Sequence, residues 1–417
     1  MTRVSCLVVS SFVFLAASCA QQPESPRLEA GPWRGVLSSP GGELPFLMEI
    51  EPGEGNPSDF SVSVVNGDER ISLSGRLEDR KVSIPFPHYD AELTATLDEE
   101  ARTMSGIWSK ALRTGARSTL PFLAVPGPGL RFEPRPDAEE RDPEAFAGRW
   151  RVLFDDSETP AVGVFEAGKS GRVSGTILTA TGDYRFLEGR ADGRDLRLST
   201  FDGAHAFLFS ARLMDDGSLA GDFWSRDVYH TGWTAQRDDE ASLPDGFTMT
   251  AWDDAVGLAD LRFRTLEGDE VSLADPAFEG RARIIEVFGS WCPNCNDSIQ
   301  AMVDLHRRYA ERGLSIVGLA FEYSDSHEDN ARQVRRFIER YEVEFPVLIA
   351  GKVDRERSHE MLPLLERIKA YPTTIFIDAE GNVRAVHTGF AGPATGAVHE
   401  ELLAEFDHLV EELLSQE

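Results

Sequence analysis

The stretch "SWCPNC", residues 290–295, places two cysteines three positions apart beside a tryptophan. The chain has 417 residues but only four cysteines, at positions 6, 19, 292 and 295. A fold of this length held together mainly by disulfide bonds is therefore excluded. The pair has to be interpreted from its own surroundings.

The residues on either side of the pair predict a strand, a turn and a helix. The apolar run 284–288 is typical of a buried strand, and Gly289 and Ser290 interrupt it. Residues with helical spacing follow the pair: Ile299, Met302, Val303, His306 and Ala310. Cys292 should therefore lie where the helix begins, with Pro293 in the first turn, where a missing N–H costs nothing.

Three kinds of chemistry are possible for the pair. A zinc site needs four ligands, and the sequence has no second cysteine pair and no closely spaced histidine pair nearby, so we assign no metal. A structural bridge is disfavoured because closing so short a loop contributes little stability. Thiol–disulfide exchange fits better: the helix N-terminus favours a thiolate on an exposed Cys292, and a shielded Cys295 would resolve the mixed disulfide.

The wider segment resembles a known family. "FGSWCPNC", preceded by "LRFRTLEGDEVSLADPAFEGRARIIEV" and followed by "YPTTIFIDAEGNVRAVHTG", is similar to the thioredoxin superfamily in its TlpA-like branch of membrane-anchored extracytoplasmic disulfide reductases. The resemblance implies an α/β thioredoxin-like domain over residues 248–417 that needs no cofactor. It also implies a cis-proline at Pro372 next to the sulfurs, and a substrate groove formed by Trp291, Pro293, Tyr371 and Pro372.

Glu286 is an acid inside the apolar run "IIEVF". In thioredoxins a buried acid six positions before the first cysteine relays protons, and the resemblance gives that role to Glu286. The alternative is that Glu286 points to solvent. Some relatives carry an acid three residues after the second cysteine, where this chain has Ser298. Its neighbour Asp297 is expected to be an ordinary residue of the first helical turn, favoured by the helix dipole.

The part of the chain before this domain repeats itself. "LSGRLEDRKVSI" at 73–84 recurs as "LEGRADGRDLRL" at 187–198, and Trp33 and Trp108 find counterparts in Trp150 and Trp224. Alternating apolar and polar residues with frequent glycine predict two antiparallel β-barrels or sandwiches, at 31–128 and 145–237, joined by a linker at 129–144. The predicted fold is therefore multidomain, with two β-repeats ahead of a thioredoxin-like domain.

The N-terminus predicts export. Residues 1–18 have an arginine near the start, an apolar run and then small residues, which is the layout of a signal peptide. The small residues before Cys19 resemble a lipoprotein cleavage site, so we expect lipidation of Cys19, a linker at 19–30 and attachment to a membrane of the cell envelope. The alternative is ordinary signal cleavage and release of the protein.

The formal net charge of −29, without a basic stretch, makes nucleic acid an unsuitable partner. The expected partners are disulfides or thiols of envelope proteins, and an upstream membrane electron donor. The β-repeats contain no recognisable catalytic cluster, so we expect them to be anchoring or partner-binding spacers. Two other functions stay open: a surface binding lipoprotein with an auxiliary thioredoxin domain, and a thiol peroxidase, although Gly289 stands where peroxiredoxins have Thr or Ser.

Overall fold

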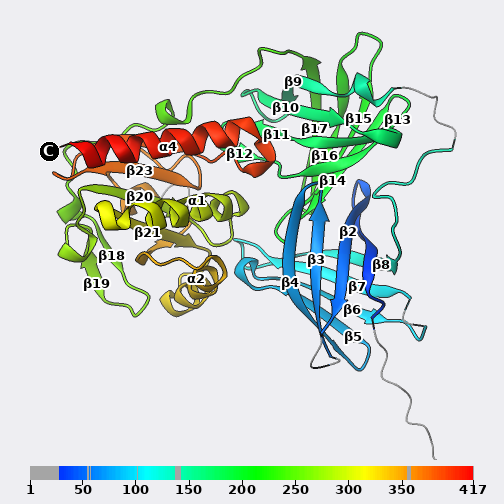
Figure 1. The fold of residues 1–417 in the computed structure, drawn as a ribbon, viewed down its shortest axis with the longest axis horizontal. Helices are drawn as coiled ribbons and strands as arrows, with labels where there is room; N and C mark the ends of the chain where they lie inside the picture. The colour runs from blue at the N-terminus through cyan, green and yellow to red at the C-terminus, as the bar shows by residue number, and fades with distance from the viewer. Residues whose placement is uncertain are drawn as a thin grey trace, which may run out of the picture.

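The computed structural model describes residues 28–416 except 54, 55, 57, 101, 137–141 and 355–357. The expected signal peptide and Cys19 lie outside the described residues. The chain forms two β-barrels and a C-terminal α/β domain, which lie side by side in Figure 1 with the barrels on the right. Within the described ranges, no helix is both long and apolar enough to cross a membrane.

The first barrel is closed and antiparallel. Its side chains alternate between the inside and the surface, as in β3, where Phe60, Val62 and Val64 point into the core. Closure occurs where β1 pairs with β8. The strands are β1 (Gly31–Ser39), β2 (Gly42–Pro52), β3 (Asp59–Asn66), β4 (Glu69–Glu78), β5 (Lys81–Phe86), β6 (Ala91–Leu97), β7 (Met104–Ala111) and β8 (Arg117–Pro126).

The second barrel follows the same plan. Its ring of strands is closed by the pairing of β10 with β11, and the short β12 extends β11. The strands are β9 (Gly148–Phe154), β10 (Ala161–Ala167), β11 (Arg172–Thr179), β12 (Gly182–Asp183), β13 (Leu187–Asp192), β14 (Asp195–Phe201), β15 (Ala206–Leu213), β16 (Leu219–Ser225) and β17 (Tyr229–Arg237). The predicted pair of β-repeats is confirmed, and both are barrels.

The tryptophans show how closely the two barrels correspond. Trp33 and Trp150 are fully buried in the first strand of each barrel, and each indole N–H donates to the carbonyl four residues earlier, at 2.8 and 3.0 Å. The correspondence of Trp108 with Trp224 is wrong. Trp108 points into its barrel, whereas Trp224 lies on the outer face of the second barrel, packed against the first. A register difference of one residue moves a strand side chain to the opposite face.

The C-terminal domain is built on a mixed sheet in the order β19-β18-β22-β21-β20-β23-β24. β20 lies centrally, parallel to β21 and antiparallel to β23. The strands are β18 (Arg262–Arg264), β19 (Glu270–Ser272), β20 (Ala282–Phe288), β21 (Leu314–Glu322), β22 (Val347–Lys352), β23 (Thr373–Asp378) and β24 (Val383–Thr388). The helices are α1 (Pro293–Tyr309), α2 (His327–Tyr341), α3 (Ser358–Met361) and α4 (Ala397–Ser415).

Two layers of side chains bury this sheet. On one face Ile284 and Phe288 of β20 pack with apolar residues of α1, α2 and α4. On the other face Ile285 and Val287 pack with the segment before β20 and with residues around α3. A strand covered on both faces should be apolar throughout, which explains the run in β20 and makes its one acid conspicuous. This strand, turn and helix arrangement confirms the thioredoxin-like fold that the resemblance implied.

Candidate active site

The cysteine pair lies at the junction of β20 and α1. Cys292 is the N-cap of α1 and Pro293 is its first residue. Both thiols are free, and the Cys292 Sγ accepts a hydrogen bond from the Cys295 backbone N–H at 3.4 Å. Cys295 is completely buried, as expected, but Cys292 is only 7 % exposed. The expectation of an exposed Cys292 is therefore wrong in this structure, because the sulfur is packed within the core cluster that includes Trp291 and Tyr371.

The residues expected to form the groove surround Cys292. The Tyr371–Pro372 peptide bond is cis, and the Cys292 thiol donates to the Tyr371 carbonyl at 3.4 Å. The Trp291 ring stacks on Tyr323 with 5.0 Å between ring centroids and meets the edge of Tyr371 at 5.6 Å. These aromatic side chains form a wall beside the sulfur.

Glu286 is fully buried in β20, so the alternative that it points to solvent is wrong. Its carboxylate accepts hydrogen bonds from the hydroxyls of Ser298 and of Thr374, the latter at 2.7 Å. Burial raises the pKa of Glu286 to about 7, although both hydrogen bonds act in the opposite direction. A carboxyl group that titrates near neutral pH is suited to accept and release a proton. Burial also raises the pKa of Cys295, and a charged Glu286 adds to that effect.

Sequence reasoning missed a second buried acid, Glu322, at the end of β21. Its two oxygens accept the backbone N–H and the hydroxyl of Ser290, both at 2.8 Å. Burial raises its pKa to about 7 as well. These hydrogen bonds fix the turn that precedes Cys292. The signal was an acid at the end of the apolar run "IVGLAFE", which is the same anomaly that identified Glu286.

Asp297 does not have the role expected from the sequence. It is buried, and its carboxylate forms an ion pair with Arg185 of the second barrel. Burial raises the pKa of Asp297 to about 7, against the influence of the Arg185 guanidinium. The expectation assumed a helix facing solvent at this point, but the second barrel covers it.

The first barrel also reaches the site. Its Tyr89 hydroxyl accepts a hydrogen bond from the Asn296 side chain in α1. Next to it, Lys110 is buried, and its ammonium donates to the Tyr89 carbonyl at 3.1 Å. Burial lowers the pKa of Lys110 to about 8.

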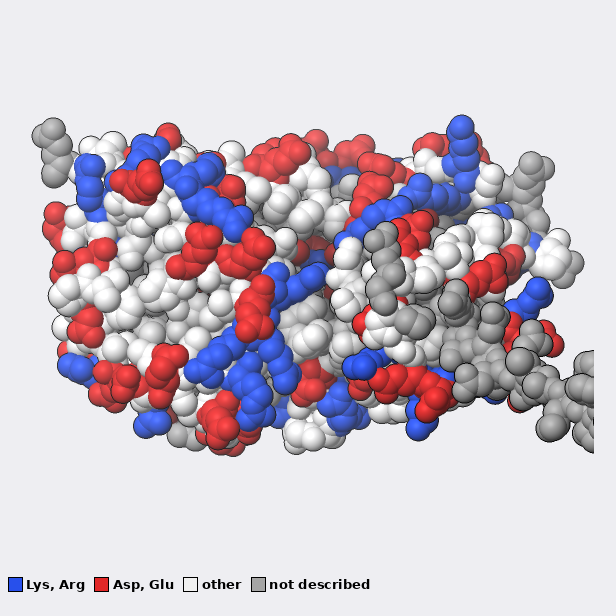
Figure 2. All heavy atoms as spheres, turned by 60° about the horizontal axis from the view of Figure 1, so that its bottom comes forward, with Lys and Arg blue, Asp and Glu red and all other residues white. Residues whose placement is uncertain are grey.

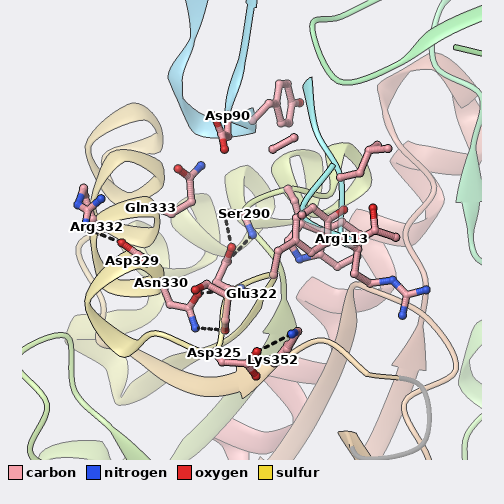
Figure 3. A pocket seen from close by; sticks show the side chains of 18 of the residues that line it. Asp90, Arg113, Ser290, Glu322, Asp325, Asp329, Asn330, Arg332, Gln333 and Lys352 are labelled. Carbon is pink, nitrogen blue, oxygen red and sulfur yellow. Dashed lines mark hydrogen bonds and ion pairs between the residues drawn. The ribbon is translucent and has the colours of Figure 1, made fainter. Parts of the chain in front are cut away.

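A cavity of about 710 Å³ lies between the first barrel and the C-terminal domain, and Figure 3 shows it from close by. Its lining includes Arg113 from the barrel and Ser290, Trp291 and Glu322 from the C-terminal domain. The β-repeats were expected to be anchoring or partner-binding spacers, and one of them forms a wall of this cavity.

A free cysteine pair at the start of a helix, beside the cis-proline that precedes β23, is the arrangement of a thiol–disulfide oxidoreductase. Residues 255–386 match the model of the AhpC/TSA family. The thioredoxin-like protein YneN of Bacillus subtilis is 31 % identical over 130 residues, which are 31 % of this chain and 68 % of that protein. The thiol–disulfide oxidoreductase ResA of Halalkalibacterium halodurans is 28 % identical over 145 residues, or 35 % of this chain and 70 % of ResA.

A solved structure of a thiol:disulfide interchange protein of the thioredoxin family from Chlorobium tepidum TLS is 24 % identical. It covers 42 % of this chain and 100 % of its own, with a TM-score of 0.28. From the relatives in sequence, the chain belongs to the thioredoxin-like thiol–disulfide oxidoreductases.

Proposed function

We propose that this protein is an exported, lipid-anchored enzyme that reduces disulfides of envelope proteins through Cys292 and Cys295. The observation that carries the proposal is the pairing of one thiol at a helix N-terminus with a second, fully buried thiol one turn later. The first sulfur caps the N-terminus of α1 and accepts a hydrogen bond from the Cys295 backbone N–H. The signal sequence and Cys19 support the export and the anchor.

In the proposed reaction, the Cys292 thiolate attacks one sulfur of the substrate disulfide. A mixed disulfide forms, and the other substrate sulfur leaves as a thiolate that takes a proton from water. Glu286 then accepts the Cys295 proton, and the Cys295 sulfur attacks Cys292. The second substrate thiol is released, two electrons have passed to the substrate, and the enzyme holds a Cys292–Cys295 disulfide. A dithiol donor at the membrane would reduce that disulfide again.

A peroxidase function fits less well. A Cβ atom at Gly289 would lie 2.2 Å from the Trp291 indole nitrogen, so the Thr or Ser of a peroxiredoxin has no room there while Trp291 keeps its position. That indole donates to the Phe321 carbonyl at 2.8 Å, which holds it in place.

Trapping tests the proposal. In cells that express the full chain with Cys295→Ser, mixed disulfides with envelope proteins should accumulate, because no resolving thiol remains. The control is the variant with both Cys292→Ser and Cys295→Ser, which should form none. Non-reducing gels followed by mass spectrometry identify the adducts. Absence of Cys292-dependent adducts would overturn the proposed exchange, and peroxide consumption by the purified protein would favour the peroxidase instead.

A further inference from the structure

The cavity beside the cysteine pair carries positive charge that the protein itself does not neutralise. Its lining contains five cationic side chains, Arg113, Arg117, Arg332, Arg336 and Lys352. Three of these are matched by acids of the same lining. Arg117 pairs with Asp90 at 3.3 Å, Arg332 with Asp329 at 2.7 Å and Lys352 with Asp325 at 2.6 Å.

Two arginines are left over. Among the described residues, no carboxylate pairs with Arg113, and Arg336 bonds only the neutral Gln333 side chain, at 3.3 Å. The last acid of the lining, Glu322, is occupied by Ser290 through both of its oxygens. In Figure 3 dashed lines join Lys352 to Asp325 and Arg332 to Asp329, while the Arg113 guanidinium extends with none. In a chain with a net charge of −29, unmatched guanidinium groups next to a redox site require an explanation.

Arg113 lines the cavity together with Trp291, the residue that precedes Cys292. Arg113 also lines a second hollow of about 250 Å³. Trp291 and Tyr323, like Arg113, line both hollows. Tyr371, whose carbonyl accepts from the Cys292 thiol, lines the second hollow. Arg113 comes from the turn between β7 and β8 of the first barrel, so the barrel brings this charge to the aromatic wall beside the nucleophile. Figure 2 shows Lys and Arg side chains gathered near the middle of one face of the molecule, with acids beside them.

We propose that the cavity binds carboxylate side chains that flank the disulfide of a polypeptide substrate, and that Arg113 and Arg336 are the residues that recognise them. The inference rests on the proposed function, because it needs a disulfide presented to Cys292. A planar guanidinium can donate two parallel hydrogen bonds to one carboxylate, which is a geometry that a lysine does not offer. A volume of about 710 Å³ accommodates several residues of a peptide.

The test uses the full chain and three peptides with one disulfide each, in which the residues next to the cysteines are Glu, Gln or Lys. Wild-type enzyme should prefer the Glu peptide over the Gln peptide by about tenfold in kcat/KM, mainly through KM, and should reject the Lys peptide. Arg113→Gln should abolish the preference, lowering kcat/KM on the Glu peptide to the value that the same variant shows on the Gln peptide. Arg113→Glu should reverse the order and favour the Lys peptide. Arg336→Gln should weaken the preference for the Glu peptide less than Arg113→Gln does.

Arg76→Gln is the matched control, because Arg76 is an exposed arginine of the same barrel, paired with Glu78 and outside the cavity lining. It should keep the full preference. Equal use of the three peptides by the wild type, or an Arg113→Gln variant that still prefers Glu, would overturn the inference. Failure of the wild type to reduce any peptide, or 2-hydroxyethyl disulfide, would instead overturn the proposed function.

Discussion

The guanidinium of Arg185, in the second barrel, forms a buried ion pair with the carboxylate of Asp297, two residues after Cys295 in α1. The same guanidinium lies 2.7 Å from Glu69 of the first barrel and 3.5 Å from Asp202 of the second. One cation therefore joins all three domains directly behind the redox site. Its position fixes how the barrels sit against the helix that carries the cysteines.

Replacing Arg185 with Met should destabilise the full chain by about 3–5 kcal/mol, because buried carboxyl groups lose their common partner. Urea unfolding measures this. Arg172→Met is the control: Arg172 is an exposed arginine of the same barrel, 3.0 Å from Glu188, and its loss should cost less than about 1 kcal/mol. Equal losses for the two variants would show that the Arg185 cluster does not hold the domains together.

Glu286→Gln should slow the resolution of the mixed disulfide by about 10²-fold near pH 8, because the group that accepts the Cys295 proton is lost. In the wild type the rate should rise with pH through about 7, where Glu286 ionises. The variant should lack this rise. Rapid-mixing fluorescence, with a pre-formed mixed disulfide, gives both profiles.

Thr374→Val is the companion variant, because it keeps Glu286 but removes the hydrogen bond of 2.7 Å to its carboxylate. Since that bond favours the charged form, its loss should move the midpoint of the pH profile upward rather than flatten the profile. A midpoint that stays in place would assign the titration to another group.

The contribution of Glu286 and Glu322 to the stability of the protein should fall as the pH rises from about 4.5 to about 7. Burial lowers the pKa of His88 and of His387 to about 4, so these two groups act in the opposite direction over the same range. Burial raises the pKa of both Glu286 and Glu322 from 4.5 to about 7, so the native state holds protons that the unfolded state has already released. The loss should be on the order of 3 kcal/mol for each group at most, and it is complete above pH 7.

The variant with both Glu286→Gln and Glu322→Gln lacks these two groups, so the stability of the wild type relative to this variant should fall over that pH range. Thermal or urea unfolding of the two proteins makes the comparison. The same pH dependence in both proteins would mean that other buried groups, such as Asp297, determine it.

A fragment that begins near Ala241 should fold and reduce 2-hydroxyethyl disulfide, since the C-terminal domain has its own two-layer core. Its Cys292 should react with iodoacetamide faster than in the full chain, because the wall formed by the first barrel is absent. It should show no preference among the Glu, Gln and Lys peptides. A folded but inactive fragment would mean that the first barrel contributes to the chemistry itself, with Lys110 as the first residue to examine.

The elements of the C-terminal domain were predictable because each is encoded locally. The apolar run of β20 and the helical spacing of α1 both follow from neighbouring residues. Glu286 could be found for the same reason, since an acid within an apolar strand is anomalous in its own sequence. Glu322 followed the same rule and was overlooked.

The rest depends on contacts between residues far apart in the chain. Nothing near Asp297 indicates that Arg185, 112 positions earlier, would cover it. Arg113 lies in a surface turn of the first barrel, and only the packing of that barrel against the C-terminal domain brings it to Trp291 and Tyr323.

The face of Trp224 was not predicted. The spacing from Trp108 to Trp224 is one residue shorter than the spacing from Trp33 to Trp150, and such a small difference is easily overlooked in a sequence. In a strand, a shift of one residue moves a side chain from the inner to the outer face.

Closure of the two barrels affects whether unfolded or partly folded chains can aggregate on this protein. A strand at the edge of an open sheet offers unpaired N–H and C=O groups on which a foreign segment can assemble. In each barrel the ring is complete, through β1 with β8 and through β10 with β11. An enzyme with the proposed function would meet such segments constantly. Its barrels could then lie against the substrate polypeptides without templating their aggregation.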